Sequence, residues 1–299
     1  MTRWWFAPAP AERLAALRIA IGAFATVWLA ARLPELWSLA HLSAHELAPV
    51  GVVRVVSAPL PVPVVLAIAV ASVACLVAFT VGWRYRITAP LAALGLLWTL
   101  SYRNAWGMVF HTDNLLVLHV IALACAPAAD AWAVDRPRPA PPAGHGWPIK
   151  LLATLTVATY LLAGIAKLRL GGWAWVGGEQ LRNQIAIDNL RKALLGSMVA
   201  PFARVLVAHP DALAGFALGT VAIELGAPLA LIGRRAGAVW AAAAWSFHVG
   251  VVLTMNVWFP YPLIGVAFLP LLEAERIALW LKARWRNAPS TPARSPGAA

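Results

Sequence analysis

Lys167 is the residue whose type and position best suit chemistry, because it places a charge at the end of a long apolar run. Tyr160, Gly164 and Lys167 recur at spacings of four and three residues, so a helix puts them on one face. The glycine thins this face and lets a ligand or a neighbouring helix approach. Burial favours the neutral amine, which acts as a general base near neutral pH. The other interpretation is that Lys167 ends a helix and extends its ammonium to the membrane interface.

Further ionisable residues lie on apolar segments, where an unpaired charge costs on the order of 3 kcal/mol at the centre of a bilayer. These candidates for a site are Arg103, His111, Asp113, His119, Glu224 and His248. The predicted topology places Lys167, Arg103, His111 and Asp113 at the outer ends of spans, with Glu224 and His248 near the middle. We expect all of these residues to line one cavity that opens outward.

Each candidate also has a structural interpretation. Arg103 can extend to the interface, and Thr112 or Asp113 can cap the helix that follows it. The histidines and Glu224 can simply hydrogen-bond within a helix bundle. These alternatives stay open at the level of sequence.

The composition identifies a membrane protein. Of the 299 residues, 61% are hydrophobic and only 12% are charged, whereas a soluble protein carries about a quarter charged residues. The net charge of +12 is concentrated in short loops and near the C-terminus, as expected for cytoplasmic loops. We therefore exclude nucleic acid as a partner. Cys75 and Cys125 lie in apolar runs without neighbouring ligands, so we expect no metal site.

The apolar runs predict an all-α, polytopic transmembrane helix bundle with about eight spans. The predicted spans are 14–33, 61–81, 87–106, 111–129, 147–166, 213–232, 237–256 and a last one that opens at Phe259. We assign residues 1–286 to a single membrane domain and 287–299 to a disordered cytoplasmic tail. The distribution of basic residues predicts a multi-pass protein of the plasma membrane with both termini in the cytoplasm.

The segment 167–211 departs from this charge pattern. It is rich in basic residues, yet the topology places it outside, between the fifth and sixth spans. Residues 180–195 predict an amphipathic helix that lies at the interface or folds over the bundle as a re-entrant segment.

Four stretches resemble a known family. They are 160–168 followed by Trp175-Val176-Gly177, Phe247-His248 followed by Phe259-Pro260-Tyr261, Asn104 followed by residues 111–115, and residues 131–135. They are similar to the HTTM family (horizontally transferred transmembrane domain), and in particular to the membrane domain of vitamin K-dependent γ-glutamyl carboxylase. In the first stretch Lys167 matches the catalytic lysine of the carboxylase, while Ala166 replaces the first of its two adjacent lysines.

The resemblance implies a membrane enzyme that binds a vitamin K-type quinol, such as menaquinol, in an outward-facing cavity. Lys167 would deprotonate the quinol, supported by His248, His111 and Asp113, and CO2 and O2 are implied as co-substrates if glutamate is carboxylated. The residues expected to contact the cofactor are Tyr160, Gly164, Asn104, Arg103, Trp175, Glu224 and Asn256. The alternative is a non-enzymatic HTTM subunit that matures or docks a secreted peptide together with a partner protein. A transporter ranks last, because no inverted repeat is evident.

Overall fold

The computed structural model describes residues 2–39, 41–107, 109, 111–135, 141–276, 279–280 and 283. For residues 2, 3, 111, 142 and 143 it describes the backbone alone. Every regular element in these ranges is helical, which confirms the all-α prediction. The predicted tail 287–299 lies outside the described residues.

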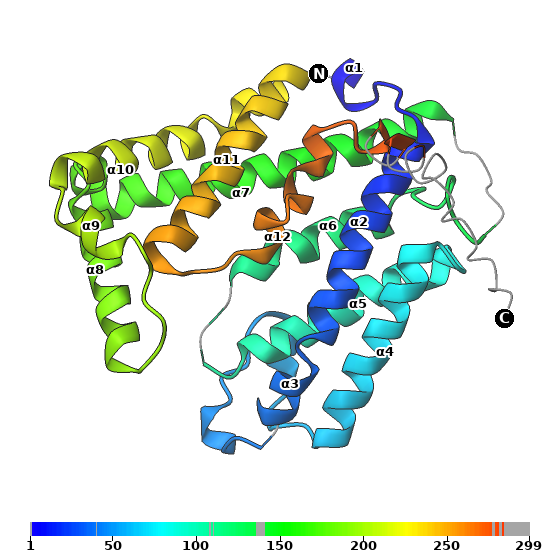
Figure 1. Cartoon of the computed structure of the whole chain (residues 1–299). Coiled ribbons are helices and arrows are strands. Elements are labelled where there is room, and N and C mark those ends of the chain that lie inside the picture. The colour runs from blue at the N-terminus through cyan, green and yellow to red at the C-terminus, as the bar shows by residue number, and fades with distance from the viewer. Residues whose placement is uncertain are drawn as a thin grey trace, which may run out of the picture.

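The N-terminal half forms one packed group of helices (Figure 1). Its elements are α1 (Thr2–Trp5), α2 (Ala11–Ala30), α3 (Leu33–Leu39), the short 3-10 helices η1 (Ala44–Glu46) and η2 (Gly51–Val55), α4 (Val62–Val81), α5 (Tyr85–Asn104), η3 (His111–Asp113) and α6 (Asn114–Ala124). Leu17 of α2, Phe79 of α4, Leu96 of α5 and Leu123 of α6 are buried in a common core. These apolar side chains hold the four helices together.

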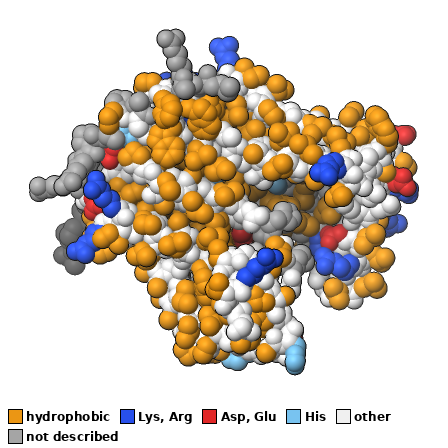
Figure 2. Space-filling view, turned by 180° about the vertical axis from the view of Figure 1, so that it is seen from behind, with side chains coloured by type: hydrophobic (Ala, Val, Ile, Leu, Met, Phe, Trp, Pro, Cys, Tyr) orange, Lys and Arg blue, Asp and Glu red, His pale blue; other side chains and the backbone are white. Residues whose placement is uncertain are grey.

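The C-terminal half is built around one long helix, α7, drawn in green in Figure 1. Its elements are α7 (Pro142–Val176), α8 (Glu179–Leu194), α9 (Ala203–Val207), α10 (Pro210–Leu225), η4 (Ala227–Leu231), α11 (Arg234–Met255), α12 (Pro260–Leu263) and η5 (Val266–Leu271). Val157 and Tyr160 of α7 pack with Trp240 and Ala244 of α11 and with Phe268 of η5 in a second core. The face in Figure 2 is covered mostly by hydrophobic side chains, as expected of a surface that meets lipid.

Four helices of the described chain are long and apolar enough to cross a membrane: Ala11–Ala30, Val62–Val81, Gly144–Val176 and Arg234–Met255. The other predicted spans coincide with elements that are shorter or more polar. α5 carries Arg86 and Arg103, α6 has 11 residues, and α10 has 16 residues before the break into η4. The membrane character is therefore confirmed, whereas the count of eight spans stays a prediction.

The turn between α4 and α5 is fixed by residues that follow α6. Asp135 accepts hydrogen bonds from the backbone N–H groups of Arg84 (2.8 Å) and Tyr85 (2.9 Å), at the start of α5. Gly82 turns the chain at φ +70°, and a Cβ there would lie 2.6 Å from the Cβ of Ala133. The stretch 131–135, which carries part of the family resemblance, thus has a structural role at this turn.

Candidate functional site

Lys167 lies inside α7 and does not end it. We expected the fifth span to stop at Ala166, but the helix continues to Val176, so that expectation is wrong. The break comes later, at Gly172, whose backbone (φ 52°, ψ −136°) is accessible to glycine and strained for other residues. The short helical segment after this break brings the buried Trp175 back toward Lys167. The lysine is therefore held on a regular helix between two neighbouring elements.

Lys167 forms an ion pair with Glu224 at the end of α10. The glutamate side chain is 3% exposed and the lysine side chain 20% exposed. Gly164, one turn before Lys167, makes the pair possible: a Cβ at this position would lie 2.9 Å from the Cβ of Glu224. The expectation that the glycine lets a neighbouring helix approach is thereby met, and the helix is α10.

Aromatic rings surround the lysine ammonium. Its Nζ lies 5.2 Å from the ring centroid of Trp175 and 5.5 Å from that of Phe247 on α11. The faces of aromatic rings attract cations at such distances. Glu224, Trp175 and Phe247 therefore form the immediate surroundings of the Lys167 Nζ atom.

His248 of α11 and Tyr160 of α7 form a second polar pair within the same group of helices. The Tyr160 hydroxyl lies 2.6 Å from His248 Nε2, and both residues are buried. Phe259, which precedes α12, packs its ring 5.2 Å from the imidazole. The structure thus brings together six of the predicted site residues on three helices: Tyr160, Gly164, Lys167, Trp175, Glu224 and His248.

Two buried polar atoms of this group lack a hydrogen-bond partner within the described residues. They are Oε2 of Glu224 and Nδ1 of His248. Buried polar atoms of native proteins are nearly always paired, so each such atom needs an explanation, and a ligand group is one. The two atoms therefore mark where a polar part of a ligand can bind.

An apolar groove of about 640 Å³ lies beside this polar group, between α8, α10 and α11. Its lining includes Leu181 and Ile185 from α8, Phe216 and Thr220 from α10, and Phe247 and Val251 from α11. Phe247 belongs both to the groove wall and to the surroundings of the Lys167 ammonium. The groove has the size of known small-molecule sites.

Arg103 and Asp113 form a separate buried cluster. Arg103 donates to Glu35 (2.7 Å) and to Asp113 (3.2 Å), and Asp113 also accepts from the indole N–H of Trp28 (3.1 Å). Asp113 makes no side-chain cap on α6, so the capping interpretation is wrong for it. The contacts described for Arg103 and Asp113 include none of Tyr160, Lys167, Glu224 or His248, so the single outward cavity stays a prediction.

The remaining predicted residues take structural positions. His119 is fully buried, with Nδ1 2.7 Å from the Tyr261 hydroxyl and Nε2 3.1 Å from the Leu152 carbonyl, which matches its structural interpretation. Asn104 is buried at the end of α5 beside Arg103. His111 begins η3, but its side chain lies outside the described residues. No group of three or more His, Cys, Asp or Glu residues in the described ranges is arranged to hold a metal ion.

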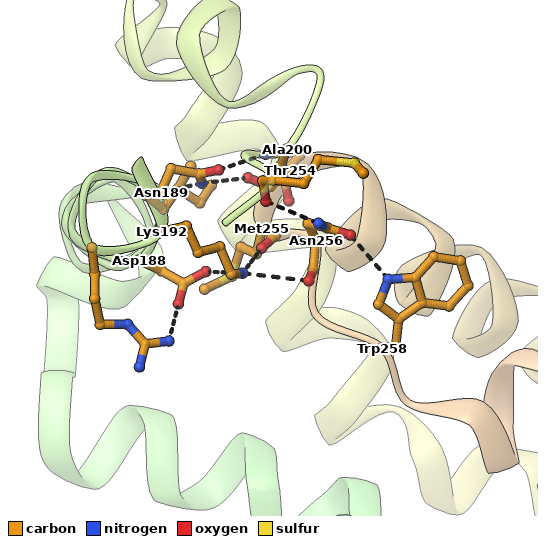
Figure 3. A network of polar contacts seen from close by, with 11 residues as sticks. Asp188, Asn189, Lys192, Ala200, Thr254, Met255, Asn256 and Trp258 are labelled. Atoms are coloured by element: carbon orange, nitrogen blue, oxygen red, sulfur yellow. Dashed lines mark hydrogen bonds and ion pairs between the residues drawn. The ribbon is translucent and has the colours of Figure 1, made fainter. Parts of the chain in front are cut away.

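Asn256 ends α11 and belongs to a polar network that fixes α8 (Figure 3). It adopts φ +48°, a left-handed conformation that asparagine tolerates at helix ends. Lys192 of α8 donates to the carbonyls of Met255 and Asn256, and Asn189 donates to the carbonyl of Thr254 (3.0 Å). α8 (Glu179–Leu194) confirms that residues 180–195 form a helix, whereas its interfacial or re-entrant placement stays a prediction. Asn256 serves the anchorage of this helix.

The sequence analysis missed three residues of consequence. Glu35 completes the Arg103 cluster, and its position outside any span gave no signal. Phe247 was named only as part of the Phe247-His248 stretch that resembles the family. Arg18 lies within the first predicted span, so the rule that flagged Arg103 applied to it as well. The structure buries Arg18 completely and directs its guanidinium to the carbonyls of Thr80, Ala128, Ala131 and Trp132.

The fold and the site define a class: an all-helical membrane protein with a partly buried lysine–carboxylate pair beside an apolar groove. The HTTM domain matches residues 6–274, and the chain therefore belongs to the HTTM family. This match confirms the resemblance noted in the sequence. No curated protein and no solved structure matches the chain.

Proposed function

We propose that this HTTM protein is a membrane enzyme that binds a lipid-soluble quinol and uses Lys167 as a general base. The observation that carries the proposal is the position of the partly buried Lys167–Glu224 pair beside an apolar groove that opens between helices. A ligand that partitions into lipid can enter such a groove laterally, and its polar end then meets the buried polar group.

The residues present fit a quinol of the menaquinol type. The groove between α10 and α11 suits a flat apolar ring system or an isoprenoid chain, because its lining is almost entirely hydrophobic. Glu224 Oε2 and His248 Nδ1 are free to bind hydroxyl groups. When bound, the quinol would supply an acidic hydroxyl group. Oxidation of the quinol by O2 can drive further chemistry, with CO2 as a co-substrate if glutamate is carboxylated.

The chain's own residues then have distinct tasks. Lys167 takes up a proton at Nζ once its amine is neutral, and Glu224 fixes the position of Nζ. Tyr160 orients the imidazole of His248 through the 2.6 Å contact. Trp175 and Phe247 exclude water around the lysine. Asp113, Arg103 and Asn104 support the α5–α6 region, and His111 remains a proposed catalytic residue from the family resemblance.

The test measures quinol chemistry in purified protein in lipid nanodiscs. Lys167→Ala is expected to leave the protein folded and to abolish oxygen-dependent turnover of reduced menaquinone. Lys150→Ala is the matched control, because Lys150 lies on the same helix over the ring of Trp4. Turnover that survives in Lys167→Ala contradicts the proposal. Mass spectrometry of an organic extract of the wild-type protein shows whether a quinone copurifies.

A second candidate function is a non-enzymatic subunit that docks a secreted peptide and matures it with a partner protein. The observation that favours it is the exposed apolar surface of the segment after α7. Leu190, Leu194, Leu195, Met198 and Phe202 are all more than half exposed there. A small partner that copurifies and protects this segment from proteolysis, in protein without quinol turnover, would favour this function. The proposed location of the segment is outside the plasma membrane, with both termini cytoplasmic.

A further inference from the structure

We propose that Glu224 is a positioning residue that holds Lys167 as an ammonium, so that the lysine becomes a base only when the carboxylate is neutralised. The role of Lys167 as base rests on the proposed function, whereas the control of its charge by Glu224 rests on the geometry of the pair alone. The experiment below separates the two.

The Glu224 carboxylate is shielded from solvent, and among the described residues Lys167 is the charged side chain that bonds to it. Glu224 is 2% exposed, and Lys167 is the only side chain for which the described residues show a hydrogen bond to its carboxylate. Oε2 has no partner in the described chain. A carboxylate with a single partner in an apolar site depends on that partner for its charge, and the ammonium depends equally on the carboxylate.

Aromatic rings lie on the ammonium side of the pair. Trp175 and Phe247 place their rings about the Nζ atom, and aromatic faces stabilise a cation but not a neutral amine. No second acidic residue of the described chain contacts Nζ. Removing the negative charge at position 224 therefore removes the main electrostatic support of the ammonium.

The chemistry of the change is one proton transfer. The Nζ–H bond of the ammonium breaks as an O–H bond forms on the Glu224 carboxylate, and the products are a neutral amine and a neutral carboxylic acid. The amine then holds a lone pair that can take a proton from a hydroxyl group. The unpartnered Oε2 is the atom through which a ligand can bring this change about.

Glutamine is nearly isosteric with a protonated glutamate, so Glu224→Gln imitates the neutralised state. The measurement is competitive labelling of lysines with acetic anhydride at neutral pH, without added quinol, followed by peptide mass spectrometry. Only a neutral amine reacts. We expect the labelling of Lys167, relative to Lys150 in the same molecules, to rise by about tenfold in Glu224→Gln, since a nearby opposite charge shifts such equilibria by roughly one to three orders of magnitude.

Two control variants show whether stronger labelling of Lys167 comes from the loss of the Glu224 charge or from easier access of the reagent. Glu224→Asp keeps the charge but shortens the side chain, so its Lys167 should stay protected, whereas a mere loosening of the site would expose the lysine in this variant too. Thr159→Val lies about two turns before Lys167 on α7, outside the groove, where its hydroxyl bonds to the Leu155 carbonyl, and should change nothing. Equal labelling of Lys167 in the wild type and Glu224→Gln overturns the proposal, as does equal enhancement in Glu224→Asp. If the labelling behaves as expected but no variant and no wild-type protein turns over quinol, the proposed function fails while this inference stands.

Discussion

Gly164 and Glu224 face each other across the contact between α7 and α10, so closely that a Cβ on the glycine would lie 2.9 Å from the Cβ of the glutamate. The same added atom would lie 3.2 Å from the backbone nitrogen of Leu225. Neither a Cβ nor a backbone atom can move aside as the end of a long side chain can. The Lys167–Glu224 pair therefore depends on a residue without a side chain one turn away.

Gly164→Ala should force α7 and α10 apart and destabilise the protein by about 1–3 kcal/mol, the usual cost of overpacking. Thermal unfolding in detergent measures this effect. Gly219→Ala on α10 is the matched control, because a Cβ at Gly219 meets no atom within 4 Å. If both variants unfold at the same temperature, the close approach of the helices is not what position 164 provides.

Asp113→Asn should destabilise the protein by about 1–3 kcal/mol, because it removes one of the two carboxylates that the buried Arg103 guanidinium contacts, while Glu35 remains. Both side chains are about 5% exposed, and their N–O distance is 3.2 Å. Chemical denaturation of the purified protein checks the value. Replacing both residues by apolar ones of similar volume should cost less than the single change. If Asp113→Asn is as stable as the wild type, the Arg103–Asp113 pair does not stabilise the fold.

Asp135 predicts a pH dependence of stability at the α4–α5 turn. Hydrogen bonds from the Tyr85 and Arg84 backbone N–H groups lower the pKa of Asp135 below its ordinary value. A lowered pKa in the folded state means that the stabilisation is present above the unfolded pKa of about 3.9 and is lost as pH falls through the folded value. Asp135→Asn should therefore reduce stability at neutral pH and bring it close to that of the wild type in acid. An equal difference at all pH values would contradict this.

Lys192→Met should release α8 from the end of α11. Lys192 supplies a cation to the terminal carbonyls of Met255 and Asn256, an interaction worth about 0.3–2 kcal/mol at a helix C-terminus. Hydrogen exchange measured by mass spectrometry should show faster exchange in α8 and unchanged exchange in α4. Arg191→Met is the control, because Arg191 is largely exposed and bonds only to Asp188 among the described residues. Similar exchange in the two variants would argue against the anchoring role of Lys192.

Much of the fold could be predicted because the apolar runs dictate helices of nearly the right bounds. The predicted span 61–81 corresponds to Val62–Val81, and the predicted helix 180–195 to Glu179–Leu194. The end of α7 could not be predicted, because residues 167–170 combine charge with high helix propensity and only Gly172 breaks the helix. The last predicted span is interrupted by prolines and is described as the short elements α12 and η5.

The residues that form the site could be predicted from the sequence, whereas the contacts between them could not. An ionisable residue in an apolar run is a signal that sequence carries, and it identified Lys167, Glu224 and His248. Which residues pair is a matter of helix packing, and the sequence had placed Lys167 and Glu224 at different depths. Their contact shows that α7 and α10 bring both to one level. Asn256 was expected at the cofactor, but its left-handed backbone and its bonds to the Met198 carbonyl and the Trp258 indole give it a role at a helix end.

The length of α7 has a consequence for the response of this protein to its bilayer. The unbroken part of the helix, residues 142–171, contains 30 residues, which at a rise of 1.5 Å per residue is about 45 Å. The hydrocarbon core of a bilayer is only about 30 Å thick. Such hydrophobic mismatch is relieved by tilting of the helix. Since Lys167 sits within the unbroken part of this helix, its depth in the membrane should differ between bilayers of short-chain and long-chain phospholipids.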